Sequence, residues 1–312
     1  MTSPVLAIVV GAGSRGEIYS DFASIHPKRM KVVGVADPRK FACRKLQQQH
    51  QIVDENIFDD WHHIIEKEKF ADAVLICTPD SLHKEPAVAF AKKGYHILLA
   101  KPTATTAEDC SAIVEACTQS GVMLSVGHVL RYDPVIRKIK VNIFSSHVLP
   151  IKSRKTYFST FAWGRIHIEI LSCLPQPITT KLKSHRCLNC MVQGLAHIIN
   201  NKLPPKEPRV HVHILLGELS YDGHGIRVFD FLTQRSTKHT APINIPRQFS
   251  MSGRGGADYQ LIDAFISAVA NNDPSLIRSG SEETLLSHLL VFDAERSRLE
   301  GRVVYCGTTS QS

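Results

Sequence analysis

The sequence predicts an α/β fold: a doubly wound parallel sheet over residues 1–135, a second α/β domain over 136–306 and a short tail over 307–312. Three observations predict it. Apolar runs alternate with amphipathic stretches as far as residue 126, and a glycine-rich turn directly follows the first apolar run. At 312 residues the chain is also long enough to bury two cores.

The expected strands of the first domain are short, continuous apolar runs: Val5–Val10, Lys31–Ala36, Ala73–Cys77, Tyr95–Leu99 and Met123–Val126. The expected helices lie between them: Gly16–Ile25, Pro38–Gln49, Ser81–Lys93 and Ala107–Ser120. Continuous apolar strands separated by helices indicate a parallel sheet that is covered on both faces.

The regular alternation stops after Pro134. Residues 141–212 follow neither a helical nor a strand period. Order returns with LLGELSYDG and GIRVFDFL, which predict a pair of strands in a hairpin, and with two predicted helices, Gly256–Ala270 and Ser281–Arg298.

The net charge of +8 is confined to one segment. Residues 141–212 hold ten Lys or Arg against two Asp or Glu, so the rest of the chain is neutral on balance. The sequence leaves open whether this segment is a functional basic patch or a solvated, poorly ordered region. Because the basicity is not spread over the fold, we expect no nucleic-acid partner.

Composition also excludes a membrane protein. No apolar run approaches the roughly 18 residues that a membrane helix needs. The N-terminal apolar run lacks a basic region before it and leads into glycines, so it predicts a strand rather than a signal peptide. Cys77 lies in an apolar run, and Cys110 and Cys117 lie one heptad apart, as reduced, buried cysteines do. We therefore expect a cytoplasmic protein.

The strongest motif is Gly11-Ala-Gly13-Ser14-Arg15-Gly16, between a predicted strand and a predicted helix. In that position Gly11 permits a tight turn, Gly13 lets a pyrophosphate approach, and Gly16 lets the helix pack closely on the strand. The N–H groups at the start of the helix, from Ser14 and Arg15, face the phosphates. The motif predicts a dinucleotide site and hence a Rossmann domain.

Asp37 closes the second predicted strand, 21 residues after Gly16. A carboxylate there accepts hydrogen bonds from the adenosine ribose and repels a 2′-phosphate, which favours NAD. Arg39, two residues later, tolerates that phosphate, so NADP stays open.

Two further segments follow the ends of predicted strands: Thr78-Pro79-Asp80-Ser81-Leu82-His83 and Ala100-Lys101-Pro102. Ligands bind at the carboxyl ends of parallel strands. Lys101 is therefore a candidate to meet a substrate oxygen, although a lysine before a proline is commonly just solvated.

In order and spacing these segments, with GHVLRY from Gly127 to Tyr132, resemble the Gfo/Idh/MocA oxidoreductases. The segments GELSYDG, GGADYQLIDAFISAV and SGSEETLLSHLLVFDAERSRLEG extend the resemblance to about 213–304. The resemblance implies a Rossmann domain followed by an α/β domain with an open, mostly antiparallel sheet. It also implies NAD(P)-dependent oxidation of a sugar, cyclitol or related polyol, and a possible homo-oligomer.

The resemblance also implies roles for individual residues. Thr78, Pro79 and His83 line the cofactor, Lys101 is the catalytic lysine and also belongs to the cofactor site, and Arg131 helps to shape the substrate site. Two departures stand against these roles. Ala100 replaces the glutamate that precedes the lysine in the family, and no helix between 141 and 212 carries the family's paired Asp and His.

Residues 141–212 hold two further candidate groups, a catalytic pair and a zinc ligand set. His167 and Glu169 supply an imidazole and a carboxylate in an unmatched context. His185, Cys187, Cys190 and His197 are a zinc ligand set in number, although one CxxC with loosely placed histidines fits reduced loop cysteines better. We expect no metal. The sequence thus indicates an NAD(P)-dependent oxidoreductase acting on a sugar-like alcohol; the alternative is a cofactor-binding relative that is weakly active or inactive, such as a sensor, a partner subunit or a degenerate isoform.

Overall fold

The computed structural model describes residues 3–134, 136–138, 160–161, 210–214, 217–221, 225–230, 232–240 and 256–300. The chain forms two compact units, each built from two stretches of sequence. The first is Met1–Tyr132 with Ile245–His288, and the second is Asp133–Asn244 with Leu289–Ser312. The candidate site lies in the first unit.

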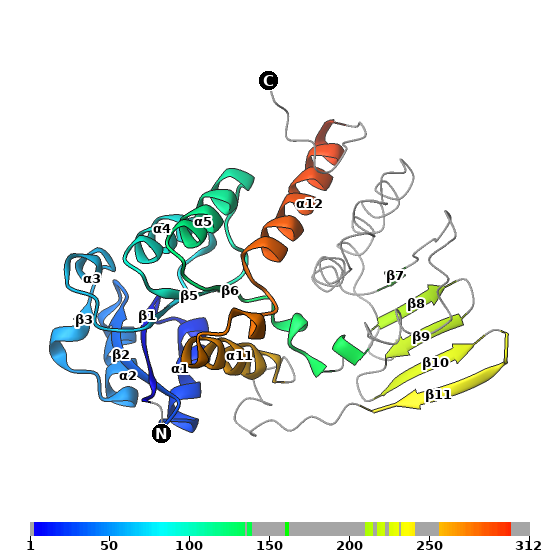
Figure 1. Ribbon diagram of the computed structural model, residues 1–312, viewed down its shortest axis with the longest axis horizontal. Coiled ribbons are helices and arrows are strands. Elements are labelled where there is room, and N and C mark those ends of the chain that lie inside the picture. Colours follow the sequence, from blue (N-terminus) through cyan, green and yellow to red (C-terminus); the bar gives the residue numbers. More distant parts are fainter. Residues whose placement is uncertain are drawn as a thin grey trace. The chain divides into compact units, whose positions relative to one another are not determined.

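The first unit is built on a six-stranded parallel sheet (Figure 1). Its strand order is β3-β2-β1-β4-β5-β6, the order of a doubly wound dinucleotide-binding fold. The strands are β1 (Val5–Val10), β2 (Met30–Ala36), β3 (Ile57–Phe58), β4 (Ala73–Ile76), β5 (His96–Leu99) and β6 (Leu124–Val126). The predicted parallel sheet is confirmed; β3 was not predicted, because two residues are too few to show a pattern.

Helices connect these strands: α1 (Ser14–Ile25), α2 (Lys40–His50), α3 (His62–Glu66), α4 (Lys84–Lys92) and α5 (Ala107–Gln119). The four predicted helices are confirmed, and the short α3 is additional. Helices α4 and α5 lie side by side (Figure 1). Helix α1 begins at Ser14, two residues before the predicted start, with Gly13 as its N-cap. The glycine motif therefore enters the first helical turn.

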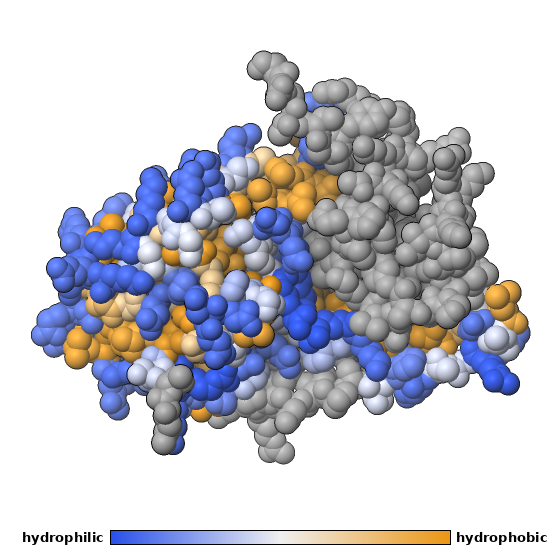
Figure 2. All heavy atoms as spheres, in the orientation of Figure 1, coloured by the Kyte–Doolittle hydropathy of each residue, from blue (hydrophilic) through white to orange (hydrophobic). Residues whose placement is uncertain are grey.

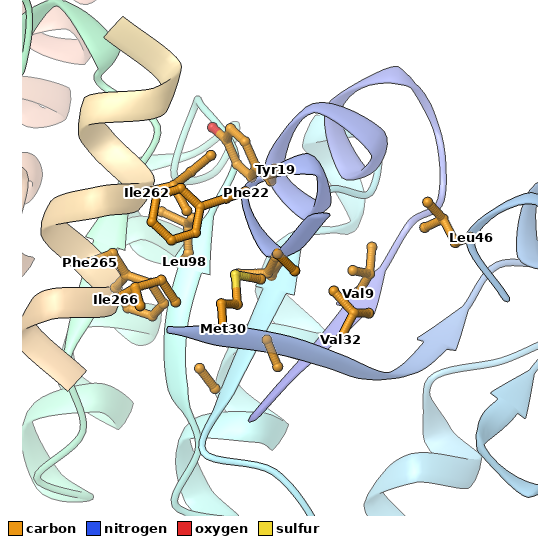
Figure 3. Packing of buried hydrophobic residues seen from close by; sticks show 14 of the residues in the cluster. Val9, Tyr19, Phe22, Met30, Val32, Leu46, Leu98, Ile262, Phe265 and Ile266 are labelled. Atoms are coloured by element: carbon orange, nitrogen blue, oxygen red, sulfur yellow. The ribbon is translucent and has the colours of Figure 1, made fainter. Parts of the chain in front are cut away.

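Helix α11 (Ala257–Asn271) belongs to the first unit, although it lies in the stretch that the sequence analysis assigns to the second domain. Its buried residues Leu261, Ile262 and Phe265 pack into the core that also holds Phe22 of α1 and Met30 of β2 (Figure 3). Apolar residues on one face of a helix require a partner surface, and the α1 side of the sheet supplies it. The chain thus returns to its first domain after the second.

Polar contacts tie α11 to the same surface. The hydroxyl of Tyr259 lies 2.8 Å from His26 Nε2, and its ring packs against Phe22. Arg29 donates to Asp263 and, at 2.9 Å, to Ser267 Oγ. Because these partners lie more than 230 residues apart in sequence, the contacts fix a long-range packing that no local pattern encodes.

The second unit contains a five-stranded sheet of order β11-β10-β9-β8-β7, with every neighbouring pair antiparallel. The strands are β7 (Thr160–Phe161), β8 (Val210–Ile214), β9 (Gly217–Tyr221), β10 (Ile226–Asp230) and β11 (Arg235–His239). The predicted hairpin is confirmed as β9 and β10. The other predicted helix is confirmed as α12 (Ser281–Glu300), which follows a short helical turn, η4 (Pro274–Leu276).

Several expectations fall outside the described residues. These are the basic segment as far as residue 209, apart from Thr160 and Phe161, the pair His167 and Glu169, and the candidate zinc ligands His185, Cys187, Cys190 and His197. The four described cysteines, Cys43, Cys77, Cys110 and Cys117, are free thiols. Burial raises the pKa of Cys117 to about 12, which keeps it an unreactive thiol.

The visible face of the first unit is mostly hydrophilic, with apolar patches between the polar groups (Figure 2). Within the described part of the chain, the exposed large apolar residues of this unit include Phe41, Val53 and Leu82. No helix in that part of the chain has both the length and the hydropathy needed to cross a membrane.

Candidate cofactor site

The candidate site begins where the strand order reverses, between β1 and β4. Ligands bind in the crevice outside the strand ends at such a point. Gly11 follows β1 with φ of +92°, a conformation that favours glycine. A Cβ on Gly11 would lie 2.6 Å from the carbonyl carbon of Cys77 and 2.9 Å from the backbone nitrogen of Thr78. The two loops therefore approach each other as closely as only a glycine allows.

Gly16 and Gly13 have different surroundings. A Cβ on Gly16 would overlap the carbonyl oxygen of Gly11 and lie 3.1 Å from Val9 Cγ1, so Gly16 is required for packing α1 on β1. A Cβ on Gly13 would meet only the guanidinium of Arg39, at 3.4 Å. Gly13 thus borders a space that the protein core does not fill, at the N-terminus of a helix whose first N–H groups lack helical partners. This is the cradle that a pyrophosphate requires.

The other two residues of the turn are placed differently from each other. Ser14 is exposed at the first position of α1. Arg15 donates from Nη1 to Asp258 Oδ1 of α11 at 2.7 Å, and its guanidinium lies 5.4 Å from the centre of the Tyr19 ring. The side chain of Arg15 thus holds α11 against α1, and a contact of Arg15 with the cofactor stays a prediction.

Asp37, at the end of β2, is almost completely buried beside the glycine turn. Its Oδ2 accepts from the N–H of Ala12 at 2.8 Å, which joins β2 to the turn between Gly11 and Gly13. Its Oδ1 accepts from the N–H of Arg39 at 2.9 Å. Burial alone raises the pKa of Asp37, but the hydrogen bonds from Arg39 and Ala12 and the charge of Arg39 outweigh it, so the pKa is below its usual value. The carboxylate is therefore ionised near neutral pH.

The segments after β4 and β5 meet through His83. Its Nδ1 lies 2.7 Å from the carbonyl oxygen of Pro102, and its Nε2 lies 3.0 Å from that of Thr78. His83 is completely buried, whereas Pro79 is exposed and Thr78 is partly exposed. The histidine thus connects the loop that begins at Thr78 to the turn that carries Lys101.

Lys101 is exposed at the end of β5, and Gly127 at the end of β6 lies next to it. The N–H of Gly127 donates to the carbonyl of Leu99 at 2.8 Å. A Cβ on Gly127 would lie 3.1 Å from the backbone nitrogen of Lys101 and 2.7 Å from the hydroxyl of Tyr19. The structure therefore brings Gly11, Asp37, Thr78 and Lys101 to the same edge of one sheet, as predicted from the strand ends.

Arg131 does not present its guanidinium to solvent. It is 5% exposed. It donates from Nη2 to Ser287 Oγ at 3.1 Å and from Nη1 to the carbonyl of Arg278 at 3.2 Å and to Glu283 Oε2 at 3.3 Å. Its Nη1 and Nη2 donors hold α12 and the segment before it, and a contact of Arg131 with a substrate stays a prediction.

Two buried histidines beside Lys101 were not singled out from the sequence. The rings of His128 and His288 meet edge to face, with centroids 5.4 Å apart. Burial lowers the pKa of both, as do the positive charges of Arg131 and Lys101. The signal for His288 was the polar pair Ser287-His288 inside the apolar run LLSHLLV, where a histidine needs hydrogen-bond partners.

His288 has those partners, and they determine its tautomer. Its Nε2 accepts from the N–H of Thr103 at 3.0 Å, so this nitrogen carries no proton. Its Nδ1 lies 2.9 Å from the carbonyl oxygen of Thr284 and donates to it. His288 is therefore neutral, and it joins α12 to the loop that follows Lys101.

Comparison with known proteins also indicates a dinucleotide-binding fold. Residues 5–128 match the family model GFO_IDH_MocA, described as an oxidoreductase family with an NAD-binding Rossmann fold. The 2,7-anhydro-N-acetylneuraminate hydratase of Escherichia coli (strain K12) is 32% identical over 124 residues, which cover 40% of this chain and 32% of that protein. The myo-inositol 2-dehydrogenase of Thermotoga maritima is 28% identical over 157 residues, 47% of this chain and 44% of that protein. The matched segments thus span less than half the length of these relatives.

Among solved structures, the fold is similar over nearly the whole chain. An oxidoreductase from Agrobacterium radiobacter, in complex with NAD+, L-tartaric acid and magnesium, superposes with a TM-score of 0.68 at 15% sequence identity. The match covers 97% of this chain and 98% of that chain. At that identity the likeness concerns the fold alone.

Proposed function

We propose that the chain belongs to the Gfo/Idh/MocA family of oxidoreductases, whose model matches residues 5–128, and that it binds NAD(H) at the glycine turn and transfers a hydride between this cofactor and a sugar- or cyclitol-like alcohol. The observation that carries the proposal is the hydrogen bond from the N–H of Ala12 to Asp37 Oδ2, at 2.8 Å. It holds a ribose-binding carboxylate against a turn whose Gly13 borders open space.

The residues of the site fit the cofactor. The start of α1 offers backbone N–H groups to the two phosphates, and Gly13 leaves room for them. Asp37 is an ionised acceptor for the ribose hydroxyls and disfavours a 2′-phosphate, so NAD is favoured over NADP. Thr78 and Pro79 border the same crevice from the end of β4.

When bound, the nicotinamide supplies the hydride chemistry. The protein's part is to orient the alcohol and to manage its proton. Lys101 is exposed at the end of β5 and donates a hydrogen bond to the reacting oxygen, which stabilises negative charge there. His83 acts as a positioning residue, because it fixes the turn after Lys101 against the loop at Thr78.

The substrate class rests on the family and on its named relatives. One is a myo-inositol dehydrogenase, and another is a hydratase of an anhydro sugar acid. Both names describe ring-shaped, hydroxyl-rich compounds. Because one relative is named a hydratase, assays on this protein must follow loss of substrate as well as formation of NADH.

A second candidate function is cofactor binding with little or no turnover. Ala100 favours it, because this buried position holds a carboxylate in the family pattern and here holds none. Arg131 favours it too, since its Nη1 and Nη2 both donate to the chain itself. General acid–base catalysis contributes about 10²- to 10⁴-fold, so an incomplete set of groups leaves slow turnover on an intact cofactor site.

The experiment is a titration combined with an activity panel. We expect NADH to bind the wild-type protein and the Lys101→Ala variant with equal strength, as measured by fluorescence. A panel of sugars, sugar acids and cyclitols is then assayed for NADH formation and for loss of substrate. Turnover that Lys101→Ala abolishes supports the oxidoreductase, and binding without turnover supports the second candidate. Absence of NADH binding to a folded wild-type protein contradicts both.

A further inference from the structure

We propose that the side chain of Arg39 occupies the adenosine ribose position in the ligand-free protein, so that it competes with NAD(H) and must leave before the cofactor binds. The inference rests on the proposed function, since it concerns the same site. In this proposal the Arg39 side chain opposes the binding of NAD(H). Once displaced, it assists the binding of a 2′-phosphorylated cofactor.

The first argument is a count of acceptor positions. An ionised carboxylate accepts about four hydrogen bonds. Asp37 already accepts four: from the N–H groups of Ala12 and Arg39 at 2.8 and 2.9 Å, and from Arg39 Nε and Nη2 at 2.9 and 2.8 Å. No position is left for the two ribose hydroxyls.

The second argument identifies which donors can be replaced. The two N–H donors belong to the backbone of the glycine turn and of the β2–α2 connection, so they move only with the fold. The two guanidinium donors belong to a side chain that is 52% exposed, while the Asp37 side chain is 4% exposed. Displacing the guanidinium vacates one position on each carboxylate oxygen, which matches a pair of vicinal hydroxyls.

The third argument places the guanidinium over the cradle. Its Nη2 would lie 3.4 Å from a Cβ on Gly13, the glycine that borders the pyrophosphate space. The same side chain therefore bridges Asp37 and the glycine turn, in place of the ribose that joins these two features when a dinucleotide is bound.

The displaced Arg39 side chain has an alternative partner nearby, the ring of Phe41. The guanidinium carbon lies 5.7 Å from the centre of the Phe41 ring, which is 71% exposed at the start of α2. A guanidinium stacked on an aromatic face keeps its charge in solvent and near the ribose. From there it can pair with a 2′-phosphate, which Asp37 repels.

The consequence is an opposite effect on the two cofactors. Removing the Arg39 side chain removes a competitor for NADH and a charge partner for NADPH. A half-exposed ion pair is a weak interaction, so we expect Arg39→Ala to tighten NADH binding about threefold to fivefold. We expect the same change to weaken NADPH binding about tenfold. A role in folding alone would move both affinities in the same direction.

The test measures NADH and NADPH affinities by fluorescence titration for the wild type, Arg39→Ala, Arg39→Lys and the control Arg44→Ala. Arg44 is an exposed residue of α2, so its loss removes the same charge without touching Asp37. Arg39→Lys keeps the charge but loses the planar fork, so we expect it to tighten NADH binding and to retain most of the NADPH affinity. Arg44→Ala is expected to change neither cofactor by more than twofold.

A second measurement needs no cofactor. A double-mutant cycle of Asp37→Asn and Arg39→Ala on urea unfolding of the ligand-free protein should show coupling between the two side chains. If the two side chains show no coupling, or if wild type and Arg39→Ala bind NADH with equal affinity, the inference is overturned. In that case, binding of NADH by the wild type still supports the proposed cofactor site. Failure of the wild type and of every variant to bind either cofactor overturns the proposed function, and the inference with it.

Discussion

Arg15 and Asp258 lie 243 residues apart in the sequence, yet Nη1 of one lies 2.7 Å from Oδ1 of the other. The pair joins α1, which begins inside the glycine turn, to the first turn of α11. The Asp258 side chain is 1% exposed and that of Arg15 is 27% exposed. The cofactor turn is therefore braced by a helix that the chain supplies only after its second sheet.

The unequal burial of the two partners predicts unequal effects of removing them. Arg15→Ala removes this cation from a buried carboxylate, and we expect a loss of about 2–4 kcal/mol in the free energy of unfolding. Asp258→Asn keeps an acceptor for the arginine, so we expect a loss of about 1 kcal/mol. Urea unfolding of both variants measures this, and an equal loss would contradict the bracing role.

Substitutions at two glycines of the glycine turn should have different effects, one on NADH binding and one on stability. Gly13→Val should leave the unfolding midpoint nearly unchanged, because only the Arg39 side chain is near, and should abolish NADH binding by filling the pyrophosphate space. Gly16→Ala should cost about 1–3 kcal/mol of stability, because its Cβ meets the Gly11 carbonyl. Thermal unfolding and NADH titration separate the two effects. A Gly13→Val protein that is folded and binds NADH normally would disprove the assignment of this turn.

Because of Asp37, the folded protein should lose stability in acid. Its pKa is lower in the folded protein than in the unfolded chain, so its ionised form stabilises the fold above about pH 4. That contribution is lost as the pH falls through the folded value. Wild type should therefore exceed Asp37→Asn in stability at pH 6, and the difference should shrink by pH 3. A stability difference that stays the same between pH 6 and pH 3 would contradict this role of Asp37.

His288 should also make the stability of the fold depend on pH, in a higher pH range than Asp37 does. Burial first, and then the charges of Lys101 and Arg131, lower its pKa in the folded protein, although the hydrogen bond to Thr284 opposes this. The unfolded chain therefore binds the extra proton below about pH 6.5, so stability falls as the pH is lowered from 7 to 5, by at most about 1.4 kcal/mol per pH unit for this group.

The measurement is the slope of unfolding free energy against pH. His288→Gln should be less stable than wild type at pH 7.5, because the Thr103 contact is altered, but its slope between pH 7 and 5 should be smaller. A His288→Gln slope equal to that of wild type would show that His288 titrates normally.

The sequence by itself determined the first sheet and its ligand edge. Strand β1 is observed at the predicted residues, and Gly11, Asp37 and Thr78 follow strand ends as expected. These features are local: continuous apolar runs of four to six residues predict buried strands, and glycines at fixed spacing predict a close turn.

Only the tertiary structure decided what the polar side chains of the site do. Arg15, Arg39 and Arg131 all carry donors suited to a phosphate or a substrate, yet they pair with Asp258, Asp37 and the 278–287 segment. A side chain takes the partner that lies nearest in space, and for two of these three the partner is more than 140 residues away in the chain. For Arg15 and Arg131, sequence spacing carries no information on the contact, because it exists only once α11 and the start of α12 have returned to the first sheet.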